Sequence, residues 1–257
     1  MRTLMVVFLV SVALAACGGG GEKTPAPAPA PAPAPPPADT GVGSITGKAM
    51  FEGEGPKQAG IQMGADPVCA KLHATPLTTE FVVVNADKSL RNVFVYVKEG
   101  LGARKYPVPT EPAVIDQVGC QYKPHVFGLR AAQELEVINS DATLHNIHAM
   151  PKLNKQFNIG QPVKGLKTRR KFEIPEVMIP FKCDVHKWMN AYAGVLDHPF
   201  FGVTAEAGSV QLKDVPAGTY VIEAWHEKYG TQTQSVTLGA NETKEITFTF
   251  KDTGASN

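Results

Sequence analysis

The sequence of 257 residues predicts an all-β fold, most simply a β-sandwich. Between residues 43 and 250, apolar and polar residues alternate with a period of two, as they do along half-buried strands. Glycine and proline interrupt these runs about every ten residues, and few segments show the period of an amphipathic helix. Short strands separated by regular turns indicate a sandwich or a barrel.

The first residues predict an export signal. Arg2 is followed by an apolar run from Leu4 to Ala16, which is too short to cross a membrane as a helix. The ending Leu-Ala-Ala-Cys resembles the signal of bacterial lipoproteins, in which the cysteine becomes the acylated first residue. This resemblance implies that residues 1–16 are removed and that Cys17 carries a lipid anchor. An ordinary signal peptide with a chance cysteine is the alternative.

Residues 17–42 predict a linker between this anchor and the folded part. Four glycines are followed by Ala-Pro alternation from Pro25 to Pro37, a composition that cannot bury a core and favours a stiff polyproline helix. At roughly 3.1 Å per residue, such a stretch would hold the folded part about 40 Å from the membrane. We expect a protein of the cell envelope. Gly18 is not the aspartate that commonly signals inner-membrane retention, so the outer membrane is preferred.

Two β modules are expected after the linker, at residues 43–198 and 199–252. The strands expected in the first are Ser44–Glu52, Phe81–Val84, Asn92–Lys98, Ala113–Asp116, Leu135–Asn139, Asn146–Ala149, Arg170–Ile174, Val177–Lys182 and Gly194–Asp197. Those expected in the second are Phe201–Thr204, Ser209–Leu212, Tyr220–Trp225, Thr231–Leu238 and Lys244–Phe250.

The fragment DVPAGTYVIEAWHEKYG resembles the carboxypeptidase-regulatory, transthyretin-like sandwich, a small accessory module. The segment GSITGKAMFEGEGPKQAGIQM also reads like the opening strands of such a module. An alternative is therefore that the N-terminal segment completes the second sandwich.

Charge and cysteine content narrow the class of protein. Without Arg2, 25 − 1 = 24 basic residues balance 24 acidic ones, so a nucleic-acid partner is not expected. Besides Cys17 there are three cysteines, and disulfides persist outside the cytoplasm. Cys69 and Cys120 lie in turn-like sequence, and we predict that they pair. Cys183 is then left free, unless one bridge is intermolecular.

The stretch FKCDVHKWM predicts a metal site. Cys183, His186 and Met189 offer a thiolate, an imidazole and a thioether, which together favour copper over hard cations. A further histidine is available in LEVINSDATLHNIHAM, where an apolar strand ends in a polar turn before His145. His148 lies three residues further on and would point to the opposite face of a strand. His125, His198 and His226 are expected to be structural.

An Asn-rich turn leading into His-Asn-Ile, followed some forty residues later by Cys-x-x-His, resembles the cupredoxin family and plastocyanins in particular. The resemblance covers roughly residues 90 to 197. It implies a Greek-key sandwich in which His145, Cys183 and His186 bind one copper ion. Asn146 would tie the two ligand loops together by hydrogen bonds. Met189 is the departure, because plastocyanins place the axial methionine two residues later, where this chain has Ala191.

The resemblance implies an electron-transfer protein rather than an enzyme, with an unidentified redox partner. Two alternatives stay open: a copper carrier or store that hands the metal to an accepting protein, and a surface adhesion or scaffold sandwich without metal. A structural zinc site is the main alternative for the metal. Zinc is disfavoured because no paired cysteines stand at C-x2–4-C spacing. A catalytic Cys-His pair is disfavoured because an exported thiol tends to be oxidised.

Overall fold

Burial along the strands explains why this sequence forms sheets. In β16 (Thr243–Lys251), Ile246, Phe248 and Phe250 are buried while the residues between them are exposed. In β1 (Val42–Glu52) the buried residues also alternate. This period of two places one face of each strand in a core and the other in water. The computed structural model describes residues 41–252, and within them the predicted all-β class is confirmed.

The predicted signal peptide of residues 1–16, Cys17 and nearly all of the predicted linker lie outside the described residues. None of the helices in residues 41–252 has the length and apolar character of a membrane span. The remaining elements are, in chain order, α1 (Pro67–Lys71), β2 (Phe94–Glu99), β3 (Ala113–Gln117), β4 (Tyr122–Lys123), β5 (Val126–Arg130), β6 (Glu134–Asn139), β7 (His145–Ala149), β8 (Phe157–Gln161), β9 (Lys167–Lys171), β10 (Glu176–Lys182), β11 (Asn190–Leu196), β12 (Phe201–Val203), β13 (Ser209–Pro216), β14 (Gly218–His226) and β15 (Gly230–Leu238).

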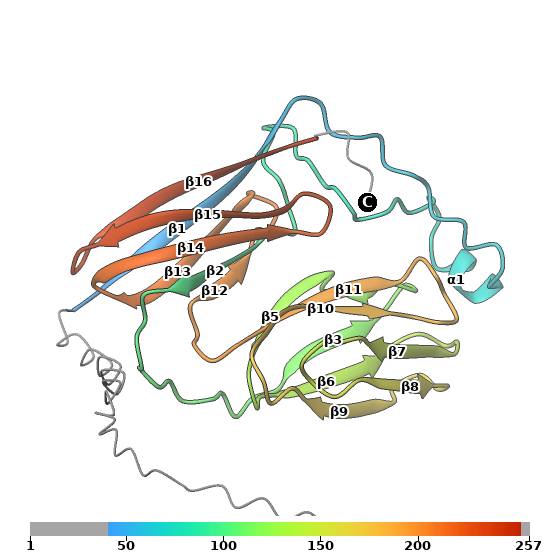
Figure 1. The fold of residues 1–257 in the computed structure, drawn as a ribbon. Helices are drawn as coiled ribbons and strands as arrows, with labels where there is room; N and C mark the ends of the chain where they lie inside the picture. The colour runs from blue at the N-terminus through green and yellow to red at the C-terminus, as the bar shows by residue number, and fades with distance from the viewer. Residues whose placement is uncertain (1–40, 253–257) are drawn as a thin grey trace, which may run out of the picture. The chain divides into compact units, whose positions relative to one another are not determined.

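Strands β3 to β11 form what we call the central sandwich, residues 113–196 (Figure 1). One sheet has the order β5-β11-β10-β7-β8 and the other has the order β4-β3-β6-β9. Side chains from both sheets fill one core, which includes Ile115, Val137, Ile147 and Phe181. The central sandwich contains the sequence segments that predicted a metal site.

The terminal sandwich comprises β1, β2 and β12 to β16, again in two sheets (Figure 1). β1 pairs with β13 and β16, and β2 pairs with β12 and β14. The predicted division at residues 198 and 199 therefore does not follow the sheets, because two strands placed in the first module pair with strands of the second. The physical reason is edge pairing: β1 lies between β13 and β16 and satisfies the backbone groups on both of its edges.

The two sandwiches meet at a small aromatic cluster. Phe94 of β2 and Phe201 of β12 stack with their ring centroids 5.8 Å apart. They face Gly194 and Gly128 of the central sandwich, where an added Cβ would lie 2.3 Å and 2.4 Å from a phenylalanine ring atom. Only glycine permits so close an approach between sheet backbone and ring. The contact places β11, which follows the predicted metal loop, against the terminal sandwich.

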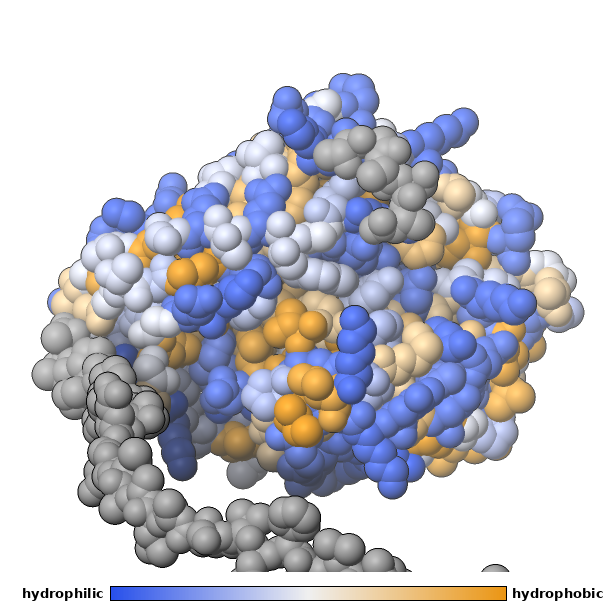
Figure 2. Space-filling model, in the orientation of Figure 1, coloured by the Kyte–Doolittle hydropathy of each residue, from blue (hydrophilic) through white to orange (hydrophobic). Residues whose placement is uncertain are grey.

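Residues 53–93 connect β1 to β2, two strands of the terminal sandwich, and are largely irregular; we call them the connecting segment. The strand predicted at Phe81–Val84 is wrong, since only an isolated bridge joins Val84 to Leu90. The side chain of Phe81 packs instead under Lys228, whose Nζ lies 4.6 Å from the ring centroid. Helix α1 lies in this segment beside the ends of β7 and β11 (Figure 1). On the face drawn in Figure 2, polar side chains predominate and apolar ones form separate small patches.

Candidate metal centre

The ligand candidates come from two neighbouring strands of one sheet. His145 is the first residue of β7, and Cys183 directly follows β10. β10 pairs with β7 through Phe181 and Lys182, so the two positions lie at the same end of the sheet. The loop between β10 and β11 is tight: the N–H of Cys183 donates to the Met189 carbonyl at 3.1 Å, and the N–H of Met189 donates to the His186 carbonyl at 2.9 Å.

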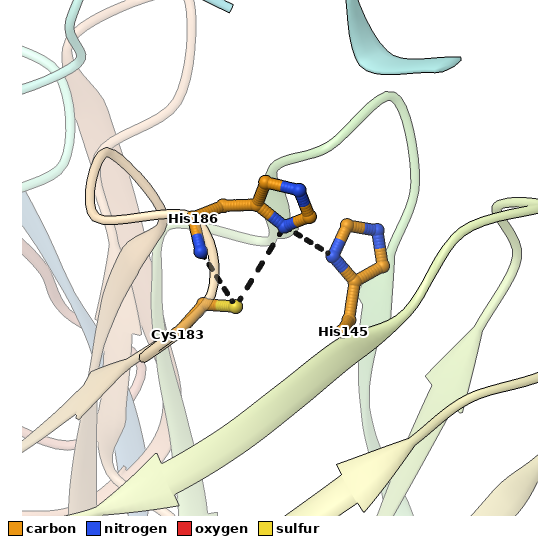
Figure 3. Close-up of side chains that lie close together, drawn as sticks. All are labelled: His145, Cys183 and His186. Atoms are coloured by element: carbon orange, nitrogen blue, oxygen red, sulfur yellow. Dashed lines mark hydrogen bonds between the residues drawn. The ribbon is translucent and has the colours of Figure 1, made fainter. Parts of the chain in front are cut away.

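Three donor atoms converge at this end of the sheet (Figure 3). Nδ1 of His145 lies 2.9 Å from Nδ1 of His186, and Sγ of Cys183 lies 3.8 Å from the latter atom. All three residues are buried, and their ligand atoms lie within 4.8 Å of one another. Two imidazolium N–H groups cannot both point into a 2.9 Å gap, so at least one nitrogen directs a lone pair there. The group could hold a single metal ion.

Asn146 connects the loop of Cys183 to β7. Its Oδ1 accepts hydrogen bonds from the Asp184 N–H at 2.7 Å and from the Val185 N–H at 3.3 Å, and it lies 3.3 Å from Sγ of Cys183. The hydroxyl of buried Tyr122 donates to the Asn146 carbonyl. Because one amide oxygen accepts from two backbone N–H groups of the loop, the loop is held in register with β7.

The electrostatics of the group favour a thiolate. Burial opposes ionisation of Cys183, but hydrogen bonds from His145 and His186 outweigh it and lower the pKa of the thiol to about 6. Burial likewise opposes protonation of His145, but its hydrogen bonds to Asp141 and Cys183 raise its pKa to about 9. A metal ion binds a thiolate and neutral imidazoles, so an ion at this site would replace the proton that these hydrogen bonds hold on His145.

A carboxylate lies at the far nitrogen of each histidine. Oδ2 of Asp141 is 3.0 Å from Nε2 of His145, and Oδ2 of Asp66 is 2.9 Å from Nε2 of His186. Neither aspartate was predicted from the sequence as a site residue. Asp141 stands in the polar turn four residues before His145 and gave a local signal. Asp66 is 120 residues from His186, and no local pattern relates the two.

A disulfide joins Cys69 to Cys120 beside these groups, with an S–S distance of 2.05 Å. Sγ of Cys69 lies 3.6 Å from Nε2 of His186, so the bridge covers that edge of the ring. The indole of Trp188 lies next to the same ring, with 5.0 Å between ring centroids, and its Nε1 donates to the Cys120 carbonyl at 3.0 Å. Cys183 is the free cysteine of the described residues.

The remaining predicted residues lie as follows. Met189 is 1% exposed and belongs to the same buried cluster as Cys183. His148 is turned to the other face of β7, where Nδ1 contacts Asp184 at 3.0 Å. His198 and His226 are buried outside the donor group, and each accepts a backbone N–H at Nδ1. His125 is paired with Glu227.

Neither a family model nor a curated protein matches this chain. Solved structures are similar to part of it. A copper-containing nitrite reductase from Thermus scotoductus SA-01 is 18% identical over 38% of this chain, with a TM-score of 0.30. A point mutant of amicyanin in its Cu(I) form is 15% identical over 39% of this chain, with a TM-score of 0.30. A purple cupredoxin from Nitrosopumilus maritimus is 20% identical over 32% of this chain, with a TM-score of 0.28.

The match spans 26% of the nitrite reductase, but 97% of the amicyanin and 98% of the purple cupredoxin. This chain therefore covers about a quarter of the reductase it is similar to. Because the TM-scores are low, the function has to be inferred from the donor atoms of this chain itself.

Proposed function

We propose that this protein binds one copper ion through His145, Cys183 and His186 and carries electrons with it. The observation that supports this is the buried convergence of two imidazole nitrogens and one thiol within 4.8 Å. A soft thiolate with two borderline imidazoles selects copper over hard cations such as Mg²⁺ or Ca²⁺. The described residues place no second free thiol beside Cys183, so the group fits a mononuclear site rather than a thiolate-bridged one.

Electron transfer is favoured over copper carriage by the way the donors are held. His145 and His186 are 0% and 2% exposed, and each has its second nitrogen in contact with a carboxylate. A carrier has to present its ligands to an accepting protein, whereas an electron carrier benefits from ligands that stay in place when the ion changes charge. A fixed, buried ligand set therefore supports electron transfer without a catalytic step.

Met189 is proposed as a weak axial ligand. It closes the ligand loop through both of its backbone groups and its side chain is buried in the cluster that contains Cys183. Its spacing from His186 is shorter than in plastocyanins, so the axial contact is the part of the ligand set that depends most on the loop. Substitution by leucine keeps the volume of the side chain and removes the sulfur.

Addition of Cu(II) to the purified metal-free protein tests the proposal. We expect an intense thiolate-to-copper absorption band in the visible spectrum, saturating at one copper per chain. Cys183→Ser should abolish the band, and Met189→Leu should shift it. His148→Ala is the matched control, because this histidine lies on the same strand but on its other face, and its spectrum should equal that of the wild type. A colourless protein that retains no copper would rule out both electron transfer and copper carriage.

The N-terminal residues bear on where the protein acts in the cell. We propose that Cys17 is acylated and that the linker of residues 17–42 tethers the two sandwiches to the bacterial envelope, with the outer membrane preferred. The redox partner would then be a protein at the same membrane surface. The terminal sandwich, with sheets of three and four strands, is proposed to be a transthyretin-like accessory module. In cell fractionation, Cys17→Ala should move the protein from the membrane to the soluble fraction; an unchanged distribution would exclude lipid tethering.

A further inference from the structure

We infer that Asp66 and Asp141 are positioning residues that keep Nδ1 of both histidine ligands turned toward the ion, and that the Cys69–Cys120 disulfide joins them into one clamp. The inference rests on the proposed function. Each histidine has one ring nitrogen in the donor group and the other against a carboxylate. When Nε2–H of a neutral imidazole donates to a carboxylate, the ring carries its lone pair on Nδ1 and cannot turn over without losing that bond.

Asp141 is held by the turn between β3 and β4. Its Oδ1 accepts the Gly119 N–H at 2.9 Å, and its Oδ2 accepts the Cys120 N–H at 2.7 Å. Gly119 and Cys120 have positive φ, 65° and 53°. This pair of left-handed residues directs two successive N–H groups at one carboxylate. The side chain of Asp141 is 4% exposed and fixed at both oxygens. Its contact with His145 is therefore set by the turn.

Asp66, in the connecting segment, contacts His186 as Asp141 contacts His145. Its Oδ1 is the N-cap of α1, accepting the N–H groups of Val68 at 2.8 Å and Cys69 at 3.3 Å. Its Oδ2 accepts the hydroxyl of Thr143 at 2.8 Å in addition to contacting His186. Thr143 lies two residues before His145. One carboxylate thus connects α1, the approach to β7 and the ligand loop.

The disulfide connects the two carboxylate supports covalently. Cys69 lies three residues after Asp66, and Cys120 donates its own N–H to Asp141. The supports come from segments 51 residues apart, and the bridge fixes the distance between them. It also covers the Nε2 edge of His186, which leaves that ring enclosed by Asp66, Cys69 and Trp188. The α1 segment and the bridge therefore restrict movement of the His186 ring, which would slow the release of an ion bound at its Nδ1.

Asp66→Ser removes the contact with His186 but keeps the cap of α1. Serine caps a helix as well as aspartate does, but its side chain is too short to reach His186 as well. In metal-free protein with ¹⁵N-labelled histidine, we expect the wild type to show a slowly exchanging Nε2–H at His186 and the variant to lose it. The affinity for Cu(II), measured by competition with a chelator, should fall about 10- to 100-fold.

Asp66→Asn and Asp116→Ser complete the test. Asparagine caps a helix as well as aspartate does but has one acceptor oxygen. With that oxygen on α1 its NH2 group faces Nε2, so this variant of nearly unchanged volume should lose the slowly exchanging proton as Asp66→Ser does. Asp116 accepts the Ser140 hydroxyl at 2.8 Å and is the matched control, which should resemble the wild type in both measurements. The clamp is excluded if Asp66→Ser keeps both the protected Nε2–H and the wild-type affinity. If the wild type binds no copper, the proposed function fails, and the imidazole signal of the metal-free protein still decides whether Asp66 positions His186.

The role of the disulfide is tested by copper release. The double variant Cys69→Ser, Cys120→Ser keeps Cys183 as its free thiol, and we expect it to lose Cu(II) to a chelator about tenfold faster than the wild type. The variant Cys69→Ala, Cys120→Ala provides the second measurement, should the serine variant fail to fold. An unchanged release rate in the variant that folds would show that the bridge does not hold the clamp closed.

Discussion

Trp188 lies in ring contact with a proposed copper ligand, since its ring centroid is 5.0 Å from that of His186. Trp225, the other tryptophan of the chain, lies in the terminal sandwich against Tyr192. Quenching of indole fluorescence by Cu(II) is short-ranged. In Trp225→Phe, which reports Trp188 alone, we therefore expect Cu(II) to remove most of the fluorescence at one equivalent.

The reciprocal variant supplies the control for this fluorescence titration. In Trp188→Phe the remaining emission comes from Trp225, and it should change much less at the same copper concentration. Equal quenching of both variants would mean that copper binds elsewhere or non-specifically. The titration needs no assumption about colour, so it also detects copper bound in a geometry without an intense visible band.

Site residues that lie close together in the sequence could be predicted, and those far apart could not. His145 with Asn146, and Cys183 with His186, form two short motifs, and the sheet brings these motifs together as a cupredoxin resemblance implies. Asp66 could not be found in this way. Its contact with His186 exists only because the connecting segment folds back over the ligand loop, and a single Asp-Pro before a helix indicates an N-cap and nothing more.

At the scale of elements, strands with a clean period of two were predicted well. β1 and β16 alternate between buried and more exposed residues, and the sequence places them within about two residues of their observed bounds. β4, β5 and β8 were missed. β4 has only two residues, and β5 is buried on nearly every residue, so neither shows an alternating pattern.

Pairing between elements was harder to predict than their existence. The parallel pairing of β1 with β16 joins strands about 200 residues apart, and alternation within a strand does not say which neighbour it takes. The resemblance of the N-terminal segment to the opening of a small sandwich was the signal that these strands belong together. The sheets follow that signal rather than the position of the strands along the chain.

At the scale of the whole molecule, buried histidines link stability to pH. His226 is 1% exposed, and burial, with the nearby charges of His125 and Lys228, lowers its pKa to about 3. Burial lowers the pKa of His198 to about 4. His125 has the opposite sign: burial alone would lower its pKa, but its pairing with Glu227 raises it. Stability from His125 is thus present below its unfolded pKa of about 6.5 and lost as the pH rises through its folded pKa.

His226 and His198 stay neutral in the folded protein at pH values where the unfolded chain takes up protons. The unfolded state then binds more protons than the native state, so the free energy of unfolding must decrease as the pH falls from about 6.5 toward about 4. A tenfold difference in proton affinity between the two states corresponds to about 1.4 kcal/mol, so each histidine should lower the free energy of unfolding by about 2–3 kcal/mol over this range.

His226→Asn keeps an acceptor for the Lys228 N–H and cannot titrate. Urea unfolding of this variant at several pH values from 7.5 to about 4 should show lower stability at neutral pH but a shallower acid slope, by close to one proton. His198→Asn should flatten the slope in the same way. Identical acid slopes in wild type and both variants would show that these two histidines are not what makes the fold sensitive to acid.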